Sequence, residues 1–199
     1  MKSNPKAYLY VLLLFTCFVG CTTKEKKVPV ISTELSEASN QKVIDSFVFY
    51  SHLNERFPIR SLKGDVHIVN FFFTTCTTIC PVMESNLDEI ASKQKNIKLV
   101  SFTIDPQNDS IPVLKKHHEL KNNPNNWVFL RGSVDDLKKV SALYLSKILE
   151  DNEEEDHNFF HTSYVVLLDK EMRIRGLYNS LENDDIEFLN KDIAVILQE

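Results

Sequence analysis

The chain has 199 residues, of which 43% are hydrophobic, and a net charge of −5. This length suits one compact domain with a proper core, and the sequence contains no internal repeat that would indicate a second one. An acidic chain is a poor match for nucleic acid or for an anionic membrane surface, so we expect neither as the partner of the folded part.

Residues 1–20 are typical of a bacterial lipoprotein signal peptide. Lys2 and Lys6 precede an apolar run at residues 8–19, which is shorter than the about 20 residues that a membrane span needs. Residues 18–21, Phe-Val-Gly-Cys, are similar to a lipobox, so we expect cleavage before Cys21 and acylation of Cys21. An uncleaved anchor and an ordinary secretory signal are the alternatives. In all three cases we expect the rest of the chain to be exported. With a lipoprotein signal, it would be lipid-anchored to the cell membrane and face the periplasm or cell exterior.

Residues 21–42 are polar and show no sustained hydrophobic period. We expect this segment to be a flexible tether between the lipid and a domain at residues 43–199. A flexible coil of some 20 residues spans roughly 25 Å. Cleavage would also remove Cys17, which leaves Cys76 and Cys80 as an even pair of free thiols in a compartment that permits disulfides.

The most informative stretch is residues 66–82, V-H-I-V-N-F-F-F-T-T-C-T-T-I-C-P-V. Its first eight residues are largely apolar and aromatic, which predicts a strand buried on both faces. Cys76 and Cys80 follow with C-x-x-x-C spacing, and Pro81 suits the first turn of a helix. Helical spacing of apolar residues then continues to about residue 95. The sequence therefore places both thiols where a buried strand turns into a helix.

This position favours thiol chemistry. The partial positive charge at a helix N-terminus stabilises thiolate over thiol. Cysteines four apart at a helix start lie on one side, so both sulfurs can face one ligand or each other. Two soft thiolates suit copper(I), zinc or a reversible disulfide. The alternative is a pair of buried structural cysteines.

The elements around this stretch predict an α/β fold, a thioredoxin-like central sheet flanked by helices with an N-terminal strand pair. Residues 46–50 and 56–60 alternate enough to form the pair, and Pro58 confines its second strand to an edge. The remaining predicted elements are strands at residues 97–104 and 127–130, helices at 111–120 and 133–147, a hairpin of 163–169 and 173–178, and a final helix at 184–197.

Several further residues carry open alternatives. His161 directly precedes a late predicted strand. In a thioredoxin-like sheet the loop before such a strand runs close to the cysteine helix, so His161 could complete a sulfur–sulfur–nitrogen site. The alternative is a hydrogen-bonded structural residue. Asp105 and Asp109 follow the strand at 97–104 and suit turn or helix-cap work, or a site at the end of the sheet. The acidic run at residues 150–156 is either a solvated loop or a docking patch. We expect His117 and His118 to be surface residues.

With these residues in place, the chain from about residue 45 to 196 resembles the Sco/SenC family of copper proteins. The resemblance rests on F-F-F-T-T-C-T-T-I-C-P-V-M, V-S-F-T-I-D-P-Q-N-D-S-I-P-V-L-K and F-H-T-S-Y-V-V-L-L-D-K-E-M-R-I-R-G in that order. It implies a thioredoxin fold, a copper ion held by Cys76, Cys80 and His161, and a role in maturing the dinuclear copper centre of cytochrome c oxidase subunit II.

The chain departs from the family pattern at two places. Thr77 and Thr78 follow the first cysteine where many members have proline and an acidic residue, and Phe160 precedes His161 where many have Asp. An electrostatic partner of the site is therefore missing, which affects the copper(II) affinity and the redox poise more than the ligand set.

The leading functional hypothesis is a membrane-anchored metallochaperone that passes copper to oxidase subunit II or a related copper protein. Two thiolates and an imidazole suit copper(I) and can also hold copper(II). The second hypothesis is a thiol–disulfide oxidoreductase that keeps the client's cysteines reduced through a mixed disulfide. A peroxidase of peroxiredoxin type and a redox-sensing lipoprotein without turnover are further alternatives.

Overall fold

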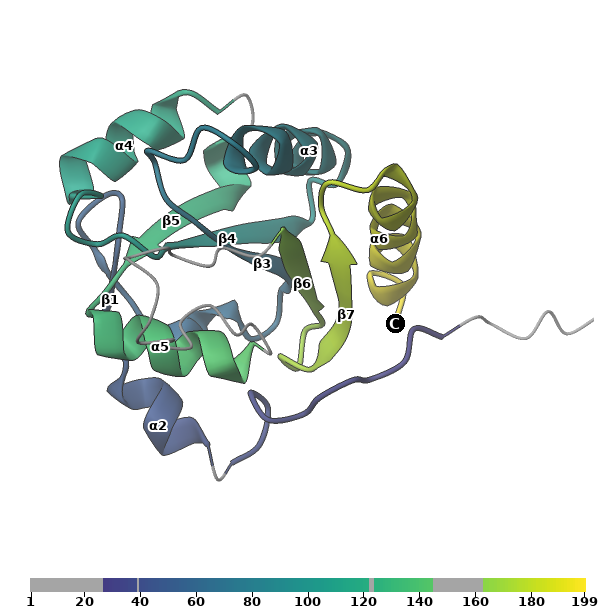
Figure 1. Ribbon diagram of the computed structural model, residues 1–199. Helices are drawn as coiled ribbons and strands as arrows, with labels where there is room; N and C mark the ends of the chain where they lie inside the picture. Colours follow the sequence, from purple (N-terminus) through teal and green to yellow (C-terminus); the bar gives the residue numbers. More distant parts are fainter. Residues whose placement is uncertain (1–26, 39, 122–123, 145–162) are drawn as a thin grey trace, which may run out of the picture.

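A seven-stranded mixed sheet of order β2-β1-β5-β4-β3-β6-β7 forms the middle layer of the computed structural model, which describes residues 27–38, 40–121, 124–144 and 163–199 (Figure 1). The central strands β3, β4 and β5 are parallel, and all other pairs are antiparallel. The strands are β1 (Phe49–Ser51), β2 (Arg56–Phe57), β3 (Val66–Phe72), β4 (Ile97–Thr103), β5 (Trp127–Arg131), β6 (Tyr164–Leu168) and β7 (Ile174–Asn179).

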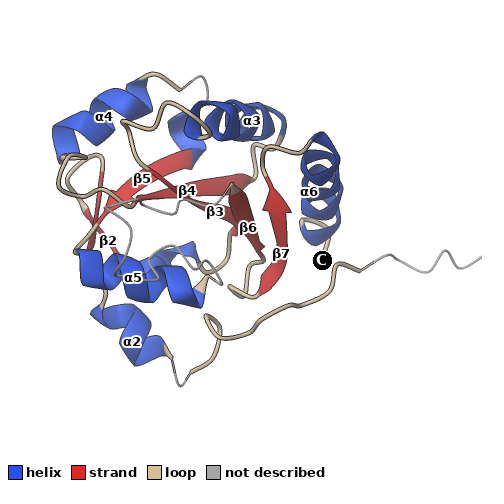
Figure 2. Cartoon of the chain, viewed as in Figure 1, coloured by secondary structure: helices blue, strands red, loops and turns tan. Residues whose placement is uncertain are grey.

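Helices cover both faces of this sheet (Figure 2). Those of the described residues are α2 (Gln41–Ser46), α3 (Cys80–Lys93), α4 (Ile111–Glu119), α5 (Val134–Leu143) and α6 (Asn183–Ile196), with 3-10 turns at η2 (Ile59–Leu62) and η3 (Pro124–Asn126). Helices α3, α4 and α6 contribute to one apolar cluster, and α2, α5 and η2 contribute to the other.

Strand β3 separates these two clusters. All seven of its residues are buried, because side chains that alternate along a strand reach opposite faces of a sheet that helices cover on both sides. Ile68 and Phe72 pack in the cluster below α3, whereas Val69 and Phe71 pack in the cluster below α5. The continuous apolar run read from the sequence is thus the central strand of the core.

The thioredoxin-like architecture predicted from the sequence is confirmed, including the N-terminal strand pair of β1 and β2. The pair differs in detail from the expected ranges. Strand β2 ends at Phe57, and residues 59–62 form a 3-10 turn, because Pro58 cannot donate a hydrogen bond to a neighbouring strand. Pro58 follows the edge strand, as its missing N–H requires.

Part of the segment expected to be a tether packs on the domain. Val28 is 6% exposed and Leu35 is 1% exposed, and Ser32 forms an antiparallel bridge with Ile174. These isolated apolar residues lie in polar surroundings and give no hydrophobic period, so the pattern alone does not reveal their burial. Residues of this segment from Val28 on therefore belong to the folded domain.

A buried arginine fixes this N-terminal segment. Arg175 on β7 is 3% exposed; its Nη1 lies 2.9 Å from Oδ2 of Asp169 and 2.8 Å from Oε2 of Glu199. Its other nitrogens donate hydrogen bonds to the backbone carbonyls of Val28 and Pro29. Each charged group in this cluster thus has a partner, as a buried ion pair requires.

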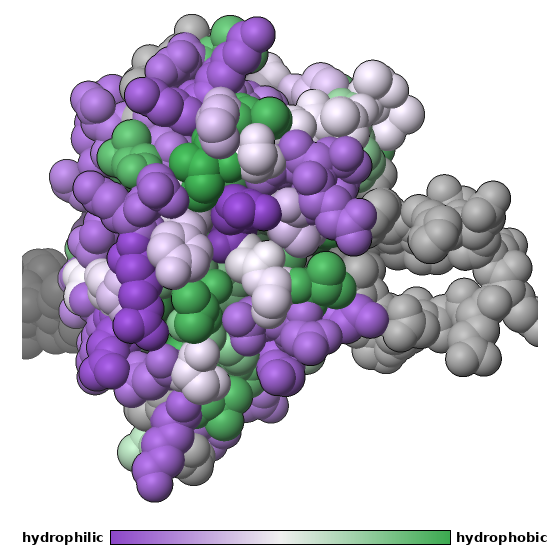
Figure 3. Space-filling model, turned by 90° about the vertical axis from the view of Figure 1, so that its left-hand side faces the viewer, coloured by the Kyte–Doolittle hydropathy of each residue, from purple (hydrophilic) through white to green (hydrophobic). Residues whose placement is uncertain are grey.

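The surface on the side of α4, β1 and α5 is mostly hydrophilic, with hydrophobic side chains in separate small patches (Figure 3). In the ranges that the structure describes, no helix is both long and apolar enough to cross a membrane. Residues 1–26, with the expected signal peptide and Cys21, lie outside those ranges.

Candidate metal centre

Cys76 and Cys80 lie where the sequence placed them, at the turn from β3 into α3. Cys76 is in the connecting loop, where its backbone N–H donates to the carbonyl of Phe73 at 3.2 Å, and Cys80 is the first residue of α3. Pro81 occupies the first turn, and no side chain caps this helix end. Both cysteines are free thiols, and they are 9% and 3% exposed.

The two thiols differ in acidity. Burial raises the pKa of Cys76, but hydrogen bonds from the Cys80 thiol, from the backbone N–H groups of Cys80 and Thr78 and from the Thr78 hydroxyl outweigh it and lower this pKa. Burial and the hydrogen bond that Cys80 donates to Cys76 raise the pKa of Cys80 to about 12. The helix terminus alone would favour both thiolates. The contacts instead make Cys76 the more acidic of the two thiols.

Both sulfurs line one cavity of about 400 Å³ between α3 and α4. Glu84 lies one helical turn after Cys80 and is 6% exposed. Its carboxylate accepts a hydrogen bond from Nε2 of His117 at 2.8 Å and pairs with Lys121. Burial raises the pKa of Glu84, but these two partners outweigh it and lower this pKa. A satisfied ion-pair cluster therefore forms one wall of the thiol cavity.

The expectation that His117 is a surface residue is wrong. Its side chain is 18% exposed and stacks on the Phe72 ring, with the ring centroids 5.4 Å apart. The sequence shows α4 as a charged helix, and only its packing against Glu84 on α3 identifies the buried side. His118, on the next position, stacks against His52 at a centroid distance of 3.8 Å.

Asp105 stabilises a turn, as expected. Its carboxylate accepts hydrogen bonds from the backbone N–H of Asn108 at 3.3 Å and from the side-chain amide of Asn108 at 2.7 Å. Asp109 does not cap α4, because the residue at the start of this helix is Ser110. Asp109 is fully buried and bonds to the loop that precedes Cys76.

The third expected ligand, His161, lies outside the described residues, as do the acidic run at 150–156 and Cys21. In the part of the chain that the structure does describe, no group of three or more His, Cys, Asp or Glu side chains could hold a metal ion. The donor set described here is therefore the thiol pair. Two adjacent soft sulfurs in an accessible cavity fit a soft cation such as copper(I).

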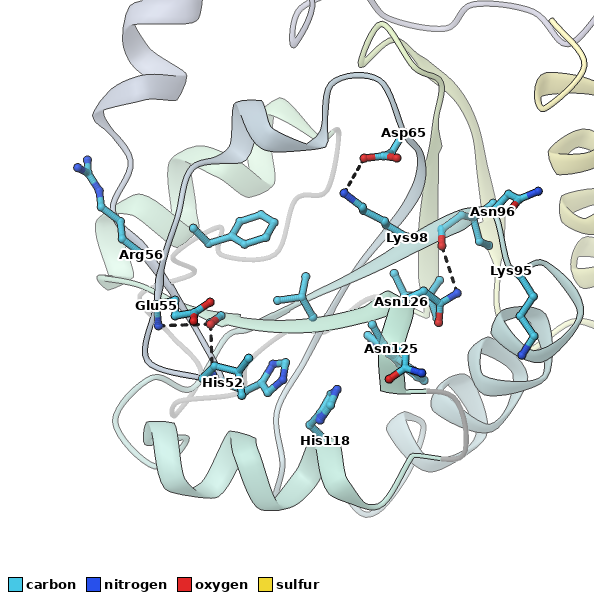
Figure 4. A pocket seen from close by; sticks show the side chains of 17 residues that line it. His52, Glu55, Arg56, Asp65, Lys95, Asn96, Lys98, His118, Asn125 and Asn126 are labelled. Atoms are coloured by element: carbon cyan, nitrogen blue, oxygen red, sulfur yellow. Dashed lines mark hydrogen bonds and ion pairs between the residues drawn. The ribbon is translucent and has the colours of Figure 1, made fainter.

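A second, larger cavity of about 720 Å³ lies at the opposite ends of the parallel strands (Figure 4). The starts of β4 and β5 and the β1–β2 turn line it, with His52 and His118 at one end and the Asp65–Lys98 ion pair at the other. Burial, and then the neighbouring His118, lower the pKa of His52 to about 4. Among the described residues, no cysteine lines this cavity, whereas both described cysteines line the smaller one.

The profile of the SCO1/SenC family matches residues 35–198 of this chain. The solved structures that are similar to this chain include three Sco proteins. BsSco, described as a member of the Sco family of cytochrome c oxidase assembly proteins with a disulfide switch, shares 28% identity and has a TM-score of 0.65, covering 84% of this chain and 97% of its own. A SCO1/SenC family lipoprotein from Bacillus anthracis shares 26% identity with a TM-score of 0.64, covering 76% and 92%.

The third is ScoI of Arabidopsis thaliana, solved with copper bound. It shares 22% identity with a TM-score of 0.62, over 77% of this chain and 97% of its own. At this identity the likeness concerns the fold.

Proposed function

The chain belongs to the SCO1/SenC family, and from this we propose that it is a copper-binding protein that acts in the assembly of cytochrome c oxidase. The observation that carries the proposal is the pair of free, hydrogen-bonded thiols, Cys76 and Cys80, in one accessible cavity. Thiolate sulfur selects copper(I) over harder cations.

We propose His161 as the third ligand, on the strength of the family motif in which it stands. Two sulfurs and one nitrogen leave copper(I) open to a further ligand, so the ion can pass to a partner by ligand exchange. The partner proposed is the site of the dinuclear copper centre in oxidase subunit II, or a related copper protein. The cavity beside the sulfurs gives the incoming ligands an approach.

We further propose that residues 1–20 are a signal peptide and that acylated Cys21 anchors the exported protein to the membrane. A relative from Bacillus anthracis is described as a lipoprotein, which supports the proposal. Because residues 28–32 are fixed on the domain by Arg175 and Ile174, the tether is shorter than the sequence suggested. Seven peptide units from Cys21 to Val28 reach at most about 25 Å. Mass spectrometry of the membrane-bound protein should find acyl chains on an N-terminal Cys21; an unmodified Cys21 or another cleavage site rules out this anchor.

A second candidate function is reduction of a client disulfide. The acidity difference within the pair favours it, because Cys76 is suited to attack and Cys80 to resolve. In that reaction the Cys76 thiolate attacks the client disulfide and releases one client thiolate. Cys80 then attacks the mixed disulfide, which leaves a Cys76–Cys80 disulfide here and a reduced client.

Copper binding is tested by anaerobic titration of the reduced, full-length mature protein with copper(I) against a competing chelator. We expect one tightly bound ion per chain in the wild type and loss of that ion in Cys76→Ala and in Cys80→Ala. His161→Ala tests the third ligand separately, and stoichiometric tight binding in that variant removes His161 from the site. A wild-type protein that does not compete with the chelator contradicts the proposal.

A further inference from the structure

Asp109 is a fully buried carboxylate at the end of the sheet that carries the thiols. Its two oxygens accept hydrogen bonds from the backbone N–H of Thr74, at 3.3 and 3.1 Å. The hydroxyl groups of Thr74 and Thr103 donate to the same carboxylate. Among the described residues, no Lys, Arg or His forms an ion pair with Asp109. The hydrogen-bond donors to its carboxyl group are thus neutral groups.

These donors lie at or just after the ends of two different strands. Thr74 follows the end of β3 and precedes Cys76 by two residues, whereas Thr103 is the last residue of β4. Asp109 itself stands just before α4, where its backbone N–H donates to the carbonyl of Asp105 at 2.9 Å. One carboxylate therefore joins the ends of two parallel strands to the start of the helix that lines the thiol cavity.

A buried carboxylate costs free energy unless its lone pairs are satisfied, and an apolar side chain would fill the same space without that cost. What an apolar residue cannot do is fix the backbone N–H and the hydroxyl of Thr74 at once. We propose that Asp109 is a positioning residue for the thiol pair: by holding Thr74 it holds the loop that presents Cys76 to Cys80. The inference rests on the proposed function only in assuming that Cys76 and Cys80 are the functional residues of the protein.

The proposal makes a prediction about the thiols themselves. With Thr74 fixed, the loop keeps Cys76 beside Cys80 on the wall of one cavity, so the two sulfurs have a high effective concentration for each other. Release of Thr74 lets the loop take other conformations. Forming the Cys76–Cys80 disulfide then requires the loop to be ordered first, which disfavours it.

The test is the thiol–disulfide equilibrium of the metal-free, full-length mature protein with glutathione. In this reaction the dithiol and one oxidised glutathione give the Cys76–Cys80 disulfide and two reduced glutathiones. We expect Asp109→Asn and Thr74→Val to lower the equilibrium constant for disulfide formation about tenfold, which raises the midpoint potential by about 30 mV. Thr103→Val is the matched control, because it removes a hydroxyl bond to the same carboxylate on the β4 side; we expect its constant to stay within about threefold of wild type.

The unfolding free energy of each variant, measured in urea, separates positioning from stability. The proposal is overturned if Asp109→Asn and Thr74→Val have a lower unfolding free energy but an equilibrium constant for disulfide formation within threefold of wild type. An equilibrium constant that shifts towards the disulfide also overturns it. If Asp109→Asn does not fold, the result for Thr74→Val alone tests the proposal. This variant should fold, because the Asp109 carboxylate still accepts hydrogen bonds from the Thr103 hydroxyl and from the backbone N–H of residue 74. The assay contains no copper, so its result is independent of whether the wild-type protein binds copper in the titration.

Discussion

The Sγ atom of Cys76 lies 3.7 Å from Oγ1 of Thr78, a hydroxyl two residues away in the same loop. Thr78 stands where many members of the family have an acidic residue. The hydroxyl can donate to a thiolate, whereas a carboxylate would repel it. Together with the thiol of Cys80 and two backbone N–H groups, Thr78 keeps the pKa of Cys76 below its ordinary value against the effect of burial.

Substitutions at Thr78 should therefore slow the reaction of Cys76 with alkylating agents near neutral pH. Thr78→Val removes one donor and should raise the pKa of Cys76, with a rate lower by a few-fold to about tenfold, as expected for a hydrogen bond to a charged group. Thr78→Asp should lower the rate further. The exposed neighbour Thr77 supplies the control, Thr77→Val, which should react like wild type. Equal pH profiles for wild type and Thr78→Val would show that the hydroxyl does not act on the thiolate.

His67 in the central strand predicts acid sensitivity of the fold. It is 0% exposed, its Nδ1 lies 2.9 Å from the backbone carbonyl oxygen of Asp65, and its Nε2 has no partner in the described part of the chain. Burial lowers the pKa of His67 from 6.5 to about 4. Between these two values the unfolded chain binds the proton and the folded one does not. Stability should therefore fall as the pH drops through this window, by about 3 kcal/mol between pH 7 and pH 4.

Urea unfolding at both pH values measures this loss. His67→Phe keeps an aromatic ring without a titrating nitrogen and should lose about 3 kcal/mol less than wild type over the same interval. The comparison uses the difference between pH values within each protein, so the cost of the substitution itself cancels. A His67→Phe protein with the same pH dependence as wild type places the acid sensitivity elsewhere.

Arg175 should hold the N-terminal segment on the domain. Arg175→Met removes one donor of the buried Asp169 and the side-chain donor of the carbonyls of Val28 and Pro29, and we expect a loss of about 3 kcal/mol of stability. Hydrogen exchange at the amide of Ile31 should accelerate in this variant, since that amide is bonded to the carbonyl of Ile174 beside Arg175.

The matched control is Arg173→Met. Arg173 pairs with the same Asp169 but its side chain is 35% exposed, so its loss should cost about 1 kcal/mol or less and leave exchange at Ile31 unchanged. Similar losses in the two variants would mean that Arg175 acts as an ordinary surface charge.

The features that are local in sequence were predictable. An apolar run, two cysteines and a first-turn proline lie within one stretch, and the structure places Cys76 and Cys80 where this pattern put them. The alternation of strands and helices gave the thioredoxin-like fold for the same reason, since each element carries its own hydrophobic period.

Contacts between distant segments were not predictable. Thr74 and Asp109 are 35 residues apart, and Glu84 and His117 are 33 apart; nothing in either local pattern points to its partner. The acidity of the two thiols follows from such contacts and from burial, so the helix terminus alone predicts the wrong pKa direction for Cys80. His161 keeps its role from the family motif, as a prediction.

Copper transfer is the most direct test of the central claim that Cys76 and Cys80 carry copper to a client. The copper(I)-loaded mature protein is mixed anaerobically with the reduced, metal-free copper domain of an oxidase subunit II, and the metal content of both proteins is measured after separation. We predict that the client gains copper and that Cys80→Ala delivers none. The contrary result is a loaded protein that transfers no copper while its metal-free dithiol quantitatively reduces the client's disulfide, which would make reduction the function of the pair.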